Sequence, residues 1–178
     1  MVKVLSGAAA MTSMDVEIVD SVKEYSDLMS QSFDFKWLKK EFDAQRLSLI
    51  FDAMHAVTGP YAKSIFSDSL GADADHIINA IPLEDFGGGH PDPNLVHAKS
   101  LIQAMSQSHS PLLGAASDGD GDRNIILGQH SFVSPSDSLA LIAEYAELIP
   151  QFSKGLTGVA RSMPTSTALD RVASAKGI

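Results

Sequence analysis

Residues 112–127 read LLGAASDGDGDRNIIL, a short apolar segment, a run of three aspartates and a second apolar segment. Asp118, Asp120 and Asp122 alternate with glycines, and in an extended chain alternate side chains project from the same side. The intervening glycines let the backbone curl without a penalty from a Cβ atom. The sequence therefore predicts two strands joined by a loop whose three carboxylates converge on one point.

Converging carboxylates repel one another unless a hard divalent cation lies among them. We therefore predict a metal loop, and the fixed charge of Arg123 beside it suits phosphate chemistry, where a metal and a guanidinium share the charge of one anion. An EF-hand needs Gly at the sixth loop position and Glu at the twelfth, where this chain has Arg123 and Gln129. A solvated Gly/Asp turn is the open alternative, although a turn needs only one such pair.

Composition sets limits on the class of protein. A length of 178 residues suits one ordinary domain and part of another. The chain's 44% apolar and 20% charged residues are typical of a globular protein. The formal charge of −9 argues against binding to nucleic acid, and no apolar run approaches the roughly 20 residues that span a bilayer. The chain has no cysteine, and its first ten residues lack the long apolar core of a signal peptide. We expect a cytoplasmic protein without a membrane segment.

Apolar runs of strand length alternate with segments of helical periodicity, which indicates an α/β layered sheet covered by helices on both faces. Strands are predicted over about 47–54, 76–83, 112–116, 124–127 and 157–163. Helices are predicted over about 21–29, 35–42, 61–70, 94–105, 136–149 and 165–173. A linker is predicted at 151–155, because a new βα unit begins after it.

Other polar residues are weaker candidates for a site. His55 follows a strand end and could be catalytic, but a packing role is favoured. His90 and His97 flank a junction between a loop and a helix, where solvation or local hydrogen bonding is favoured over metal binding. Residues 161–167 form a turn whose hydroxyls could hold an anion, with helix capping favoured. No serine lies in a nucleophile elbow, so we assign no catalytic residue.

Four stretches resemble phosphoglucomutase, a family of the α-D-phosphohexomutase superfamily, in the family's order along the chain. They are residues 52–61, 82–94, 114–124 and 161–166. The family has four domains, and the resemblance implies that residues 14–150 are its metal-binding second domain, of the layered α/β/α type. Residues 155–178 would then be the incomplete start of the third domain, its first βα unit.

The resemblance also implies the roles of the loop residues. Family members bind Mg²⁺ through the three loop aspartates and a phosphoserine oxygen, which assigns Asp118, Asp120 and Asp122 as ligands. Arg123 would touch the sugar phosphate, and Asp122 lies where a family member contacts substrate. Ser117 stands where the family has Phe, a departure that removes no ligand.

By the same resemblance, the parent protein interconverts glucose 1-phosphate and glucose 6-phosphate by Mg²⁺-assisted phosphoryl transfer through a bisphosphate intermediate. The serine that donates the phosphoryl group belongs to a domain missing from this sequence. We therefore expect the chain to be inactive alone and to work with the remaining domains. The alternative is a non-catalytic, phosphoglucomutase-like scaffold or trafficking protein.

Overall fold

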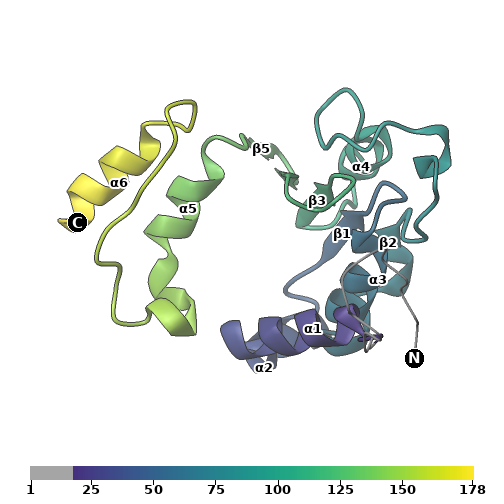
Figure 1. Cartoon of the computed structure of the whole chain (residues 1–178), viewed down its shortest axis with the longest axis horizontal. Helices are drawn as coiled ribbons and strands as arrows, with labels where there is room; N and C mark the ends of the chain where they lie inside the picture. The colour runs from purple at the N-terminus through teal and green to yellow at the C-terminus, as the bar shows by residue number, and fades with distance from the viewer. Residues whose placement is uncertain (1–17) are drawn as a thin grey trace, which may run out of the picture.

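The computed structural model describes residues 18–178 and confirms the expected α/β architecture (Figure 1). One sheet of five strands has the order β2-β1-β3-β4-β5. β1 pairs in parallel with both β2 and β3, whereas β4 and β5 are added antiparallel. The carboxyl ends of the three parallel strands therefore lie at one edge of the sheet, where open α/β sheets place their ligands. The strands are β1 Leu49–Asp52, β2 Ile77–Ile78, β3 Leu113–Ser117, β4 Asn124–Gly128 and β5 Ser131–Val133.

Helix α4 (Lys99–Met105) covers one face of the sheet. Leu101, which is 0% exposed, and Met105 pack with Ile50 and other apolar side chains of that face. Gly114 makes the close approach possible, because a Cβ at this position would lie 2.7 Å from the Met105 side chain. The small residues of β3 thus let a helix pack directly on the strand that leads into the aspartate loop.

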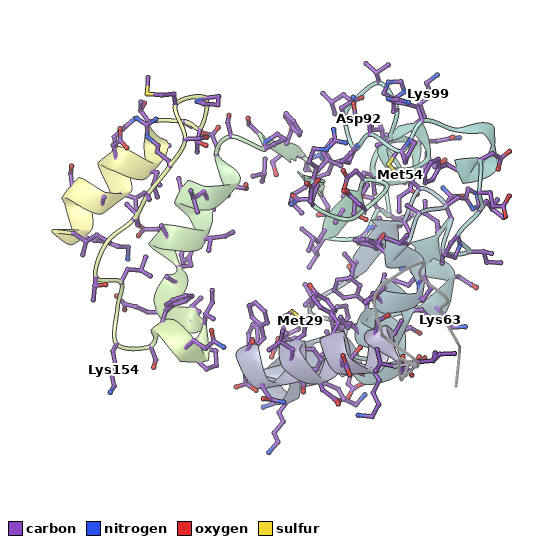
Figure 2. The ribbon with its side chains drawn as sticks, viewed as in Figure 1. Met29, Met54, Lys63, Asp92, Lys99 and Lys154 are labelled. Atoms are coloured by element: carbon purple, nitrogen blue, oxygen red, sulfur yellow. The ribbon has the colours of Figure 1, made fainter. Side chains whose placement is uncertain are left out.

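The opposite face is covered by α3 (Thr58–Ala62) and the π-helical turn Lys63–Ser69 that continues it. Phe66 of this turn packs on Phe51 of β1, with ring centroids 5.6 Å apart. Helix α1 (Ser21–Ser32) packs on α3 and on this turn, and α2 (Phe35–Asp43) follows it along the chain. Figure 2 labels Met29 on α1. The predicted coverage of both faces is confirmed.

The last part of the chain forms a second, smaller apolar cluster. Helix α5 (Ser138–Glu144) packs on α6 (Ala168–Lys176) through Ala140, Ala143 and Leu169. Figure 1 shows these two helices side by side and apart from the sheet. Contacts therefore connect segments on both sides of the expected linker at 151–155, and the division into domains 14–150 and 155–178 stays a prediction.

Several predicted elements differ from the structure. The strand expected over 76–83 is reduced to two residues and follows a 3₁₀ turn, and the helix expected from Asn94 begins at Lys99. The strand expected over 157–163 is wrong, since this described segment has no regular structure. β5 was not predicted. The remaining short helical turns, all 3₁₀, are Ala74–His76, Phe86–Gly88, Ala146–Leu148 and Pro150–Phe152.

Among residues 18–178, no helix combines the length and the apolar character needed to cross a membrane.

Candidate metal centre

The aspartate loop closes a hairpin between β3 and β4. Ser117 pairs with Asn124 at the end of the ladder, and the Asp118 backbone N–H donates to the Arg123 carbonyl at 3.2 Å. Gly121 has φ +81°, a conformation that residues with a Cβ rarely adopt. The predicted strand–loop–strand unit is confirmed, and its loop lies at the edge formed by the carboxyl ends of the parallel strands.

Asp118 is buried and held by Arg123. Its side chain is 1% exposed, and its two oxygens accept from the Arg123 backbone N–H at 3.0 Å and from Nε at 2.8 Å. Burial by itself would raise the pKa of Asp118, but the hydrogen bonds from Arg123 outweigh it and leave the pKa below its ordinary value. The same contact raises the pKa of Arg123. Asp118 is therefore an anionic anchor that orients a guanidinium.

Asp120 and Asp122 complete the predicted triad at the exposed side of the loop. Asp118, Asp120 and Asp122 each offer a carboxylate oxygen within 4.8 Å of the others. Repulsion from Asp120 is the largest cause that raises the pKa of Asp122, and contact with Asp118 adds to it. Clustered carboxylate oxygens whose negative charges repel one another suit a hard cation such as Mg²⁺. The donor set fits the expected metal, and the role of the three residues as ligands stays a prediction.

Residues from distant segments support the loop. Thr58, at the start of α3, shares a hydrogen bond of 2.6 Å with Ser117, and a Cβ on Gly121 would lie 2.7 Å from the Thr58 methyl group. Asp92 lies near the loop as well, with an oxygen 3.3 Å from Arg123 Nη1. The sequence alone did not reveal the contacts of Thr58 and Asp92, because these residues are far from the loop along the chain.

Next to the loop, the strand ends carry a polar pair, buried Asp52 and half-buried Asn79, that the sequence did not reveal. Asp52, at the end of β1, accepts from the Met54 backbone N–H at 2.8 Å and from the Asn79 side chain at 2.9 Å. His55 has a ring nitrogen 3.0 Å from the Ile81 carbonyl and packs against Gly87. These contacts agree with the favoured packing role of His55.

The other weak candidates have local partners. Within 161–167, Ser166 accepts from the Ala168 N–H at the start of α6, whereas the side chain of Thr167, in the cap position, makes no capping hydrogen bond. Arg161 forms a forked ion pair with Asp170. His90 and His97, in contrast, lie against each other, with ring centroids 4.5 Å apart. Both are exposed, which agrees with their interpretation as solvated histidines.

Comparison with known proteins agrees with this geometry. Residues 23–131 match the model of the phosphoglucomutase/phosphomannomutase α/β/α domain II. The chain is 58% identical over 163 residues to phosphoglucomutase 1, chloroplastic, of Marchantia polymorpha, covering 92% of this chain and 25% of that protein. It is 54% identical to the cytoplasmic phosphoglucomutase of Pisum sativum, covering 89% of this chain and 28% of the relative.

A solved structure shows the same fold at similar identity. It is the open form of the exocytosis-sensitive phosphoprotein pp63/parafusin, a phosphoglucomutase from Paramecium, with a TM-score of 0.88 and 50% identity. The match covers 96% of this chain and 31% of that one. The chain thus spans about a quarter of the length of the curated relatives that it matches. It belongs to the phosphoglucomutase/phosphomannomutase family and contains that family's α/β/α domain II.

Proposed function

We propose that the chain is the metal-loop part of a phosphoglucomutase that interconverts glucose 1-phosphate and glucose 6-phosphate through a bisphosphate intermediate. The observation that carries the proposal is the convergence of Asp118, Asp120 and Asp122 beside Arg123. The similarity to phosphoglucomutases at 50–58% identity supports it. Glucose, as the sugar, comes from the family resemblance alone.

In this proposal the three aspartates hold Mg²⁺, which when bound acts as a Lewis acid toward the transferring phosphoryl group. Arg123 binds the sugar phosphate. Its Nε is occupied by Asp118 at 2.8 Å, whereas Nη1 makes only a longer contact of 3.3 Å with Asp92. A guanidinium has five N–H donors, so the remaining ones are free to reach phosphate oxygens in a forked geometry.

Asp122 is exposed and within 3.6 Å of the Arg123 Nε. It can therefore meet both a metal ion and the substrate held by Arg123, as the family resemblance implies. By the family resemblance the phosphoryl donor is a serine of another domain, whereas the hydroxyls of Thr58 and Ser117 at this edge hydrogen-bond to each other. This is why we propose that the chain is inactive alone.

Two measurements test the proposal. The chain alone, supplied with glucose 1-phosphate, the bisphosphate activator and Mg²⁺, should form no glucose 6-phosphate, and appreciable turnover would refute the inactivity. A full-length protein that carries this chain should be active, and Arg123→Gln should raise its KM for glucose 1-phosphate and lower kcat. An Arg123→Gln protein with unchanged kinetics would contradict the role of the guanidinium.

The alternative is a non-catalytic scaffold or trafficking protein. One observation favours it: the solved relative from Paramecium is named an exocytosis-sensitive phosphoprotein as well as a phosphoglucomutase. The gene upstream discriminates the two functions, because the enzyme needs a serine in a Ser-His-Asn context and a scaffold does not.

We also propose a cytoplasmic location, although the relatives include chloroplastic as well as cytoplasmic proteins. A fluorescent fusion of the full-length protein that accumulates in an organelle would contradict it.

A further inference from the structure

A second group of metal-binding side chains lies outside the aspartate loop. His90, Asp92 and His97 each offer a ligand atom within 4.8 Å of the other two. All three come from one stretch of eight residues, HPDPNLVH, which precedes α4. Figure 2 shows Asp92 in the loops beside α4. Two imidazoles and one carboxylate form a donor set that zinc and neighbouring transition metals prefer, in contrast to the all-oxygen set of the aspartate loop.

The backbone of this stretch is restrained in a way that keeps the three side chains together. Pro91 and Pro93 fix φ on both sides of Asp92. Asn94 then ties the group together, because its Nδ2 donates to Asp92 Oδ2 at 2.6 Å and its Oδ1 accepts from the His97 backbone N–H at 2.9 Å. Outer contacts of this kind orient the ligands of metal sites.

The two histidines also face open space. His90 and His97 line a hollow of about 170 Å³ together with residues of the strand ends, among them Asp52, His55 and Asn79. Both histidines are exposed, so water or a small anion can occupy the remaining coordination positions. Three protein ligands with an open position are the arrangement of catalytic and exchangeable zinc sites rather than closed structural ones.

We propose that His90, Asp92 and His97 form a binding site for a transition-metal ion of the Zn²⁺ class, separate from the Mg²⁺ loop. The site adjoins the proposed phosphate-binding group, because Asp92 Oδ1 lies 3.3 Å from Arg123 Nη1. A metal ion on Asp92 competes with that contact and adds positive charge beside the guanidinium. The inference does not depend on the activity proposed above, since it rests on the side chains of residues 90–97 alone.

Calorimetric titration of the 178-residue chain with ZnCl₂, in the presence of excess Mg²⁺ to occupy the aspartate loop, tests the site. We expect one Zn²⁺ per chain. His90→Gln and His97→Gln should each weaken Zn²⁺ binding by at least about tenfold. Loss of a residue that only hydrogen-bonds to a metal ligand already lowers metal affinity by about 10–100-fold. His109→Gln and His130→Gln, at exposed histidines elsewhere, should bind as the unchanged chain does.

Two results would overturn the proposal: unchanged Zn²⁺ affinity in the His90 and His97 variants, or an equal loss in the control variants. A spectroscopic measurement keeps the test independent of folding. In NMR spectra of the histidine rings, Zn²⁺ should shift the signals of His90 and His97 and leave that of His130 in place. Asp120→Asn, in the other metal loop, should keep these shifts, and their loss in that variant would assign the ion to the aspartates instead.

Discussion

Replacing Asp118 with Asn tests whether this carboxylate anchors the loop as well as binding metal. The Asp118 side chain is 1% exposed and accepts two hydrogen bonds from Arg123. An asparagine keeps one oxygen for the Arg123 backbone N–H. Its amide group, however, places a donor opposite Nε, which is also a donor. The substitution therefore removes a charged hydrogen bond and leaves the rest of the hairpin intact.

The expected loss of stability in Asp118→Asn follows from the hydrogen bond between Asp118 and Arg123. A hydrogen bond to a charged group contributes about 1.5–3 kcal/mol. The Arg123 side chain is 63% exposed, so water can solvate the guanidinium and no buried cation is left behind, which keeps the cost within that range. One kcal/mol shifts the melting temperature by about 2–4 °C in a chain of this size, so Asp118→Asn should melt roughly 3–12 °C lower.

Asp120→Asn is the matched control, because it removes another predicted ligand from an exposed position. It also removes the largest repulsion acting on Asp122. Thermal unfolding followed by circular dichroism should therefore show a change within about 0.5 kcal/mol for this variant. Calorimetry should show a loss of Mg²⁺ affinity in both variants. Equal melting temperatures for the two variants would refute the anchoring role of Asp118.

The pH dependence of stability provides a second check on Asp118. Its pKa is lowered in the folded chain, so its contribution is present above the unfolded value of about 4 and is lost as the pH falls below that value. The difference in unfolding free energy between the unchanged chain and Asp118→Asn should accordingly be largest near neutral pH and should shrink toward pH 3. A constant difference over this range would contradict the ionic origin of the effect.

Three further substitutions test the fold. Gly59→Ala places a Cβ 1.9 Å from the Ala80 carbonyl oxygen, so urea denaturation should show a loss of at least about 1–3 kcal/mol, and near-neutral behaviour would contradict the packing. Leu101→Ala, at a position 0% exposed, should lose about 2–5 kcal/mol by the same measurement, and a loss under 1 kcal/mol would place α4 elsewhere. Arg161 lowers the pKa of Asp170, so Asp170→Asn should lower the melting temperature more at pH 7 than at pH 3.

The predictions that the structure confirms rest on local patterns. The hairpin around the aspartate loop was predicted closely, because both strands and the turn between them are adjacent in sequence. The helices predicted over 21–29 and 35–42 form as α1 and α2, and in each the preceding aspartate, Asp20 or Asp34, accepts from the N–H group three residues later. These interactions need no other part of the molecule.

The predictions that failed depend on competing partners. Asn94 does make capping contacts, because its side-chain oxygen accepts from the Val96 and His97 N–H groups, but Ala98 has ψ 46°, outside the helical range, so the regular helix begins only at Lys99. The segment 157–163 has strand-like composition. In the structure, however, Leu156 and Val159 pack on the cluster formed by α5 and α6. A strand needs a neighbour to accept its hydrogen bonds, and composition does not indicate whether one is available.

The convergence of Asp118, Asp120 and Asp122 and the fixed charge of Arg123 could be predicted from the sequence alone, because their geometry follows from a spacing of two residues along one loop. The residues from distant segments that contact this loop could not be predicted from the sequence. Asp92 lies 31 residues from Arg123, and Thr58 lies 59 residues from Ser117. Only the tertiary structure brings them together, since strand order places the carboxyl ends of β1, β2 and β3 at one edge and hydrophobic periodicity does not specify strand order.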